Sequence, residues 1–174
     1  MKKKFKVAII GLGYVGLPLA VKFGKIVETI GFDISVSKIE KLNKYLDPSG
    51  EISSFEIKRS KKLFFTSNRR HLSQIDYYIV AVPTPLISNT NNPNFQLLKK
   101  ACQIIGKNLK KKSIIIFEST VFPGATKDIC IKELEKSSNM NWLEDFNVGY
   151  SPERINPGDK TKSFNKITKL ISAD

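Results

Sequence analysis

The chain of 174 residues is 41% hydrophobic, which suits one domain (residues 1–174) whose core needs no disulfide or metal cross-links. Its 29 Lys and Arg residues outnumber 16 Asp and Glu residues, and the formal net charge is +13 at pH 7. The lysines are scattered, without an aromatic-rich RNA-binding signature or a helix-turn-helix pattern, so we expect a solvated basic surface rather than a nucleic-acid partner.

The N-terminus superficially resembles a secretion signal, because Lys2, Lys3 and Lys4 precede an uncharged run at residues 7–21. This run contains glycines at a fixed spacing, has no small-residue cleavage site and continues into Lys22. No later segment approaches the ~20 apolar residues that span a bilayer. We therefore expect a cytoplasmic protein without a membrane partner.

A nucleotide-binding turn is predicted where the first apolar strand, residues 6–10, ends. The sequence G-L-G-Y-V-G at residues 11–16 has the G-x-G-x-x-G spacing. In this pattern Gly11 permits the tight turn, Gly13 lets the backbone approach a pyrophosphate, and Gly16 lets the following helix lie close to the sheet. The N-terminal amides of that helix would face the phosphates.

The next helix and strand complete the binding unit. A helix is expected from near Tyr14 to about Lys25, and a second strand at residues 27–32 ends in Asp33. An acidic residue at this place can accept hydrogen bonds from the adenosine ribose hydroxyls. The unit predicts a dinucleotide site, and the absence of arginine at residues 34–35 predicts NAD rather than its phosphorylated form.

Helices and strands continue to alternate in the middle of the chain. Residues 36–45 are predicted as a second helix, and residues 53–60 as a short helix before a third strand at residues 63–66. The β-branched run at residues 76–82 predicts a fourth strand. His71, the only histidine, has no partner nearby in sequence, and we expect it on the surface.

Two further pairs of helix and strand end the pattern. Asn94 is expected to cap a long helix whose apolar face carries Cys102 as a core residue and ends near Leu109. A buried strand at residues 113–117, a helix at 125–136 and a sixth strand at 146–150 follow. Cys102 and Cys130 have no C-x-x-C spacing and no nearby histidine, so we expect no metal site and a reducing compartment.

This rhythm predicts an α/β fold, a Rossmann-type doubly wound sheet. We expect six mostly parallel strands in the order 3-2-1-4-5-6, with helices on both faces. Ligands of such sheets bind outside the carboxyl ends of the strands. The candidate binding segments are those that leave strands one, two, four, five and six, namely residues 11–16, 33–38, 83–85, 118–120 and 151–154.

Five motifs in these regions carry a family resemblance. They are V-A-I-I-G-L-G-Y-V-G-L-P-L-A, G-F-D-I, A-V-P-T-P, E-S-T-V-F-P-G-A-T and G-Y-S-P-E-R-I-N-P-G-D. In this order they resemble the N-terminal domain of the UDP-glucose/GDP-mannose dehydrogenase family, and most of all its bacterial UDP-N-acetylhexosamine 6-dehydrogenases of polysaccharide synthesis. The resemblance implies oxidation of the sugar's C6 alcohol to a carboxylate, with two NAD⁺ reduced and a thioester on a catalytic cysteine as intermediate.

The resemblance implies cofactor contacts at matching positions. The pyrophosphate loop is matched by Gly11, Gly13, Tyr14, Val15 and Gly16, and the ribose-binding acid by Asp33. Lys38 falls where the family has a basic residue near the adenosine, although a solvated helix lysine explains it equally. Pro83 and Thr84 match the contact that leaves strand four, where prolines hold the backbone, and the alternative is a simple turn.

The resemblance also implies the catalytic and substrate-binding residues. Thr120 matches a threonine that contacts the cofactor and orders a water beside the reacting carbon. Glu153 matches the acid implicated as the base of thioester hydrolysis, since a carboxylate can take the proton of the attacking water. Substrate contacts are implied for Glu153, Arg154, Ile155 and Asn156. UDP-glucose dehydrogenases have F-L and a second acid after S-P-E, so R-I-N-P-G favours an N-acetylhexosamine.

The family continues beyond the part that is matched, with a connecting helix, a G-G-x-C-x-x-K-type catalytic segment and a UDP-binding domain. None of these occurs in the 174 residues, and neither Cys102 nor Cys130 lies where it could replace the nucleophile. The resemblance therefore implies an inactive part of an oligomeric enzyme, whose partners are a UDP-sugar and a C-terminal half.

Two alternatives keep the fold but change the function. The chain could be a stand-alone NAD-binding or regulatory module, or a Rossmann dehydrogenase of the 6-phosphogluconate or 3-hydroxyacyl type. A lysine- or histidine-based site after strand five would favour the second alternative. This chain has E-S-T-V there instead, at residues 118–121.

Overall fold

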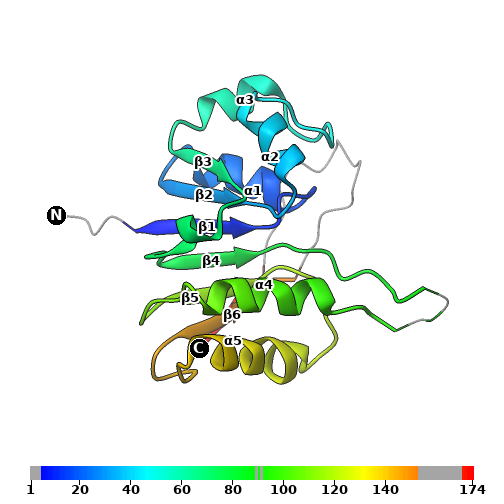
Figure 1. Ribbon diagram of the computed structural model, residues 1–174, viewed down its shortest axis with the longest axis vertical. Coiled ribbons are helices and arrows are strands. Elements are labelled where there is room, and N and C mark those ends of the chain that lie inside the picture. Colours follow the sequence, from blue (N-terminus) through cyan, green and yellow to red (C-terminus); the bar gives the residue numbers. More distant parts are fainter. Residues whose placement is uncertain (1–4, 89, 91, 153–169) are drawn as a thin grey trace.

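One seven-stranded sheet organises the chain in the computed structural model, which describes residues 5–88, 90, 92–152 and 170–174. The strands are β1 (Lys6–Ile10), β2 (Glu28–Phe32), β3 (Leu63–Thr66), β4 (Tyr77–Val80), β5 (Ile114–Phe117), β6 (Asn147–Tyr150) and β7 (Ser172–Ala173). Their order is β3-β2-β1-β4-β5-β6-β7, and Figure 1 shows the first six stacked from β3 to β6. The doubly wound order that the sequence predicts is therefore confirmed.

The seventh strand was not predicted. Its two residues pair antiparallel with β6, Gly149 opposite Ala173 and Tyr150 opposite Ser172, whereas all other neighbouring strands are parallel. Both residues of β7 are exposed, so no apolar pattern marks the strand in the sequence.

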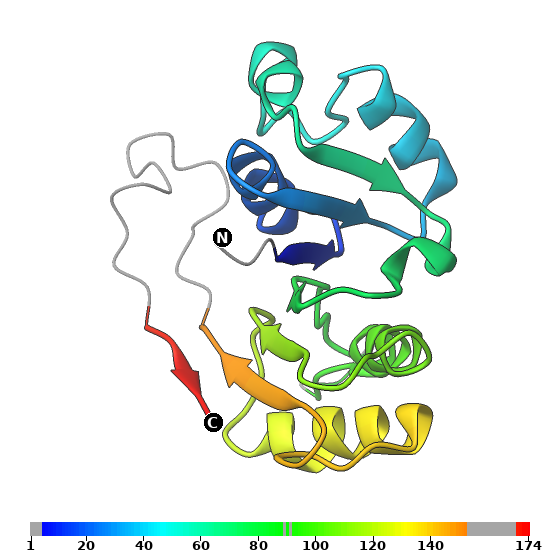
Figure 2. The same cartoon turned by 90° about the vertical axis from the view of Figure 1, so that its left-hand side faces the viewer.

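Helices cover both faces of the sheet, and each face has its own core. The helices are α1 (Gly16–Phe23), α2 (Val36–Asn43), α3 (Ser54–Arg59), α4 (Gln96–Gly106) and α5 (Lys132–Ser138), with the π-helical η2 (Thr126–Ile131) before α5. Figure 2 shows α1 against one face and α4 against the other. Because side chains alternate along a strand, Val7 and Ile9 pack with α1, while Ala8 and Ile10 pack with α4.

Several helix boundaries differ from the prediction. The first helix begins at Gly16 rather than near Tyr14, because the preceding residues form the turn after β1. The N-cap of α4 is Phe95, so the predicted cap, Asn94, lies one residue before the capping position. The Asn94 side chain still accepts a hydrogen bond from the N–H of Gln96, the first residue of the helix (2.9 Å). The helix expected at residues 125–136 is divided into a π-helical turn and α5.

The connection from β3 to β4 contains one 3₁₀ turn, η1 (Arg69–Leu72). His71 in this turn is exposed, as expected, but it does have a partner, because its Nδ1 lies 2.8 Å from Thr66 Oγ1. Cys102 and Cys130 are both fully buried in the core beside α4, as expected for Cys102. Within the described ranges, no helix combines the length and the apolar character that crossing a bilayer requires.

Candidate functional site

The turn after β1 brings the backbone close to the start of α1. Gly11 has a φ of +93°, a conformation that side chains disfavour, and its N–H donates to the Phe32 carbonyl (2.8 Å). A Cβ on Gly16 would overlap the Gly11 carbonyl oxygen, whereas a Cβ on Gly13 would meet nothing within 4 Å. The turn is therefore closed on its inner side and open at Gly13, where a ligand can approach the backbone.

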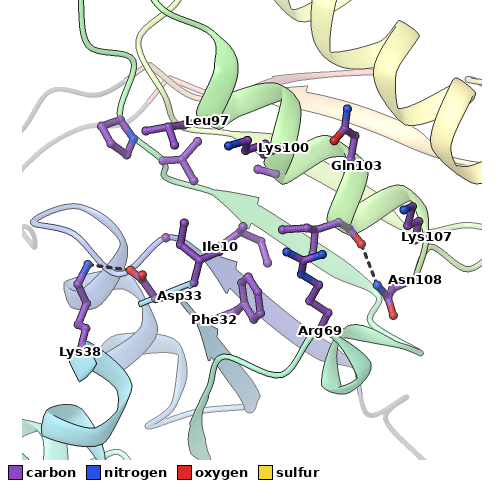
Figure 3. Close-up of a pocket in the computed structure, with 16 residues that line it drawn as sticks. Ile10, Phe32, Asp33, Lys38, Arg69, Leu97, Lys100, Gln103, Lys107 and Asn108 are labelled. Carbon is purple, nitrogen blue, oxygen red and sulfur yellow. Dashed lines mark hydrogen bonds and ion pairs between the residues drawn. The ribbon is translucent and has the colours of Figure 1, made fainter. Parts of the chain in front are cut away.

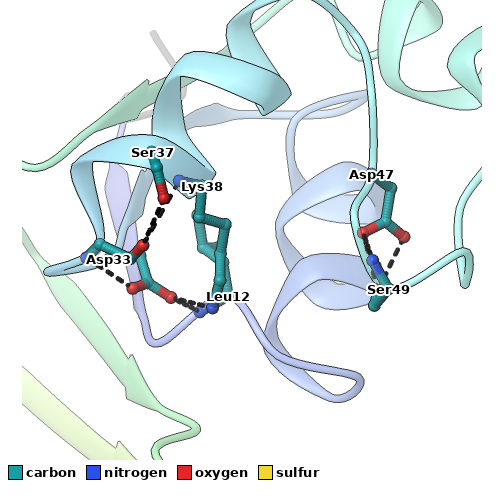
Figure 4. A network of polar contacts seen from close by, with 7 residues as sticks. Leu12, Asp33, Ser37, Lys38, Asp47 and Ser49 are labelled. Atoms are coloured by element: carbon teal, nitrogen blue, oxygen red, sulfur yellow. Dashed lines mark hydrogen bonds and ion pairs between the residues drawn. The ribbon is translucent and has the colours of Figure 1, made fainter.

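Asp33 lies at the carboxyl end of β2 beside this turn. Its side chain is 10% exposed and accepts hydrogen bonds at both oxygens. The Leu12 N–H (3.0 Å) and the Lys38 ammonium (2.8 Å) donate to Oδ2, and the Ser35 N–H (3.0 Å) donates to Oδ1. Figure 4 shows how Lys38 reaches back from α2 to Asp33. The carboxylate is thereby fixed at the mouth of the glycine turn.

These contacts determine the protonation state of Asp33. Burial alone raises the pKa of this carboxyl, but the hydrogen bonds from the Lys38 ammonium and from the Ser35 and Leu12 N–H groups outweigh burial. The pKa of Asp33 is therefore held below its ordinary value of 3.8. At neutral pH the site contains an ionised acceptor, which suits the two hydroxyls of a ribose.

Asp33 forms one end of a cavity of about 550 Å³ over the carboxyl ends of β1 and β2. Ile10, Phe32, Ile34 and Val82 give it apolar walls, and the exposed face of α4 closes its other side. Figure 3 shows Asp33 and Lys38 at one end, and Arg69 reaching up from η1 toward α4. Apolar walls beside a carboxylate suit an adenine ring joined to a ribose.

A second cavity of about 410 Å³ lies on the other side of Val82 and Pro83, which line both cavities. It is lined by Gly13, Tyr14, Val15, Ala81, Thr84, Pro85, Glu118, Ser119 and Thr120 together with those two residues. The Thr84 hydroxyl donates to the Thr120 carbonyl (2.8 Å), and the Ser119 hydroxyl donates to the Val82 carbonyl (2.6 Å). The loops after β4 and β5 are thus tied to each other.

The two cavities bring together most of the residues predicted from the sequence. Gly11, Asp33, Lys38 and Pro83 line the first cavity; Gly13, Tyr14, Val15, Pro83, Thr84 and Thr120 line the second. Gly16 lies behind the turn, against the Gly11 carbonyl. The predicted substrate residues Glu153, Arg154, Ile155 and Asn156 lie outside the described residues.

Sequence reasoning missed Arg69, which enters the first cavity from η1. The candidate segments do not include the one after the third strand, although β3 runs parallel to β2 and ends at the same edge of the sheet. The parallel order of the strands was the signal that could have found it. Glu118 and Ser119, which line the second cavity, are both buried; they belong to the candidate segment at residues 118–120 but were not predicted individually as site residues.

The residues present fit a dinucleotide. The open side of the glycine turn suits a pyrophosphate, and each of the two cavities beside it can take one nucleoside half. Among the described residues, no group of three His, Cys, Asp or Glu side chains could hold a metal ion.

Comparisons with known proteins agree with this geometry. The sequence model of the UDP-glucose/GDP-mannose dehydrogenase family, NAD binding domain, matches residues 5–173. A UDP-N-acetyl-D-glucosamine 6-dehydrogenase of Pseudomonas aeruginosa is 49% identical over 98% of this chain and 40% of its own length. One of Salmonella typhi is 44% identical, over 96% and 39%.

Solved structures show the same likeness. An NDP-N-acetyl-D-galactosaminuronic acid dehydrogenase of Methanosarcina mazei superposes with a TM-score of 0.89 at 28% identity, over 99% of this chain and 39% of that one. UDP-D-ManNAc dehydrogenase of Pyrococcus horikoshii gives 0.83 at 28% identity, over 97% and 41%. The chain therefore spans about 40% of the length of the relatives that it matches.

Proposed function

The chain belongs to the UDP-glucose/GDP-mannose dehydrogenase family, whose NAD-binding domain it forms, and we propose that it serves a nucleotide-sugar 6-dehydrogenase. The whole enzyme would oxidise the C6 alcohol of a UDP-N-acetylhexosamine to a carboxylate, for surface polysaccharide synthesis. The observation that carries this proposal is the 49% identity to a UDP-N-acetyl-D-glucosamine 6-dehydrogenase over nearly the whole chain. Membership of this family argues against the alternative that the chain is a Rossmann dehydrogenase of the 6-phosphogluconate or 3-hydroxyacyl type.

The chain's own residues would hold NAD in an extended form along the sheet edge. Asp33 would accept hydrogen bonds from the adenosine ribose in the first cavity, and the backbone at Gly13 would meet the pyrophosphate. The α1 N-terminus adds a favourable dipole for that negative charge. Bound NAD supplies the hydride acceptor of the reaction. Pro83 and Thr84 would place its second half in the second cavity.

Thr120 and Glu153 are proposed to act beside the reacting carbon. Thr120 is exposed in the wall of the second cavity, and its carbonyl is held by Thr84, which supports a role in ordering a water there. Glu153 follows Ser151 and Pro152, and the Ser151 N–H donates to the Phe117 carbonyl (2.9 Å) at the same sheet edge. The match of its S-P-E motif to the acid of the family supports Glu153 as the base that activates water during thioester hydrolysis.

The remaining parts of the enzyme are proposed from the length of the relatives. Because they extend well beyond the matched region, a C-terminal half would supply the nucleophilic cysteine and bind the UDP-sugar. We further propose an oligomeric enzyme in the cytoplasm. The two free cysteines among the described residues are compatible with a reducing compartment.

A reconstituted enzyme tests the proposed substrate. The chain would be joined to the C-terminal half of the Pseudomonas aeruginosa relative, and NADH formation would be followed with UDP-N-acetylglucosamine and with UDP-glucose. We expect a higher kcat/KM for UDP-N-acetylglucosamine, because Arg154 and Asn156 replace the pattern of the glucose enzymes. The relative's own enzyme is the control for activity of the C-terminal half. A preference for UDP-glucose in the fusion alone would reject the proposal.

A further inference from the structure

Lys38 occupies a place on Asp33 that a ribose needs. A carboxylate offers about four acceptor positions, two on each oxygen. Asp33 Oδ2 already accepts from the Leu12 N–H (3.0 Å) and from Lys38 Nζ (2.8 Å), while Oδ1 accepts, among the described residues, only from the Ser35 N–H (3.0 Å). A ribose diol that bridges both oxygens can therefore bind fully only after one donor leaves Oδ2.

Of the two donors on Oδ2, Lys38 is the one that can leave. The Leu12 N–H is part of the glycine turn, and Leu12 itself is buried, so moving it would disturb the turn. The Lys38 ammonium lies at the end of a flexible stem of four carbons, and the Lys38 side chain is 30% exposed. Losing this contact costs one partly exposed ion pair and leaves the backbone in place.

A displaced Lys38 would stay within reach of the ribose, because α2 begins directly after the Asp33 segment. In NADPH the ribose 2′ position carries a phosphate with nearly two negative charges. An ammonium beside it stabilises the phosphate, and the same ammonium offsets the repulsion from the Asp33 carboxylate. Residues 34 and 35 carry no such charge, whereas the fold brings the Lys38 ammonium to Asp33.

We infer that Lys38 is a displaceable latch on Asp33 and the residue that limits how strongly this site discriminates against a 2′-phosphorylated cofactor. NADH remains the preferred ligand, since the buried carboxylate still faces the ribose. NADPH nevertheless binds measurably. This inference concerns cofactor binding alone and does not depend on the sugar oxidation proposed above.

A general positive field in the cavity is the competing explanation. Arg69, Lys100 and Lys107 line the same cavity. Figure 3 shows Arg69 rising from η1 at the other end of the cavity from Asp33, with Phe32 between them. Arg69→Gln therefore removes one charge from the cavity without touching Asp33. Lys41→Met removes an exposed lysine from the same helix as Lys38, outside the cavity.

The experiment measures the dissociation constants of NADH and NADPH for the chain and its variants at one salt concentration. Lys38→Met should weaken NADPH binding about tenfold, the equivalent of one charge-assisted hydrogen bond. The same variant should leave NADH binding within about twofold, because the latch no longer has to be displaced. Arg69→Gln and Lys41→Met should leave the ratio of the two constants unchanged, and Lys38→Arg should preserve it.

A double-mutant cycle with Asp33→Asn separates the latch from a merely structural lysine. A merely structural lysine would act only through Asp33, so its effect on NADPH would vanish in the Asp33→Asn background. There we expect Lys38→Met still to weaken NADPH binding about tenfold and again to leave NADH binding within about twofold. Thermal unfolding of each variant checks the fold, and Lys38→Gln is the second variant if Met destabilises α2. The inference would be overturned if Lys38→Met lost NADH and NADPH affinity equally. It would also be overturned if Arg69→Gln changed the ratio of the two dissociation constants as much as Lys38→Met does.

Discussion

At the scale of single residues, the site depends on groups whose neighbours come from distant parts of the chain. Asp33 follows β2, but one of the donors that fix it, the Leu12 N–H, belongs to the turn after β1. Thr84 and Thr120 leave different strands and share a hydrogen bond of 2.8 Å. The residue types can be read from the sequence, whereas the charge state of Asp33 and the orientation of the Asp33 and Thr84 side chains follow from these contacts.

The depressed pKa of Asp33 gives a pH dependence of stability with a definite sign. A carboxyl whose folded-state pKa lies below its unfolded value contributes stability above the unfolded pKa, and this contribution is lost as the pH falls through the folded pKa. The difference in unfolding free energy between the wild type and Asp33→Asn should therefore be constant at neutral pH and shrink below about pH 3.8. Urea unfolding across this range checks it. A difference that grows on acidification would contradict the assignment.

Glu153→Gln tests the proposed hydrolytic base in the reconstituted enzyme. The amide keeps the size of the carboxylate but cannot take a proton from water, and a general base contributes about 10²–10⁴-fold in rate. We expect turnover to fall by such a factor, with NADH binding unchanged and an acyl-enzyme accumulating after an acid quench. Normal turnover, or a stall before any acyl-enzyme forms, would exclude this role.

At the scale of elements, the packing of the glycine turn against the start of α1 determines where a cofactor can approach the backbone. The turn closes on Gly16 and stays open at Gly13. Three parallel pairs, β2–β1, β1–β4 and β4–β5, then place the segments after their carboxyl ends side by side. The two cavities share Val82 and Pro83 for this reason.

Alanine substitutions at Gly16 and Gly13 should affect different properties, the first the stability of the fold and the second the binding of NADH. Within a helix, Gly→Ala ordinarily stabilises by about 1 kcal/mol. In Gly16→Ala the new Cβ would overlap the Gly11 carbonyl, so we expect destabilisation by about 1–3 kcal/mol instead. Gly13→Ala should leave stability nearly unchanged and still weaken NADH binding, because its Cβ points into open space. Urea unfolding and NADH titration would measure both, and equal stability losses would refute the distinction.

At the scale of the whole molecule, the chain is a cofactor-binding unit with a strongly positive surface. Its net charge of +13 suits anionic ligands such as dinucleotides and UDP-sugars. Both described cavities lie at the edge formed by the carboxyl ends of the parallel strands, as expected for this fold. The relatives are more than twice as long, so we expect this edge to face a further part of the enzyme.

The isolated chain should bind NADH without oxidising a UDP-sugar. Thioester chemistry needs a nucleophilic cysteine at the reacting carbon, and Cys102 and Cys130 are both buried in the core and line neither cavity. Purified chain would be incubated with NAD⁺ and UDP-N-acetylglucosamine, and absorbance would report NADH. The reconstituted enzyme is the positive control. NADH formation by the chain alone would contradict this expectation.

The sequence by itself determined the strand order and most of the candidate site. Apolar runs at β1, β4 and β5 and the glycine spacing are local patterns, and in a parallel sheet such patterns leave few topologies. Asp33 could be identified because it closely follows a predicted strand, whereas Thr84 and Thr120, in loops after strands four and five, were assigned through the family resemblance. The fold and the ends of its strands were therefore accessible without coordinates.

Only the tertiary structure decided the contacts between side chains in the candidate site. Lys38 could equally have been a solvated helix residue, and only the tertiary structure places its ammonium 2.8 Å from Asp33. Arg69 enters the cavity through η1, and β7 exists only by pairing with β6. These features arise from segments whose polar side chains carry no periodic pattern, so their energy depends on neighbours that the linear sequence does not specify.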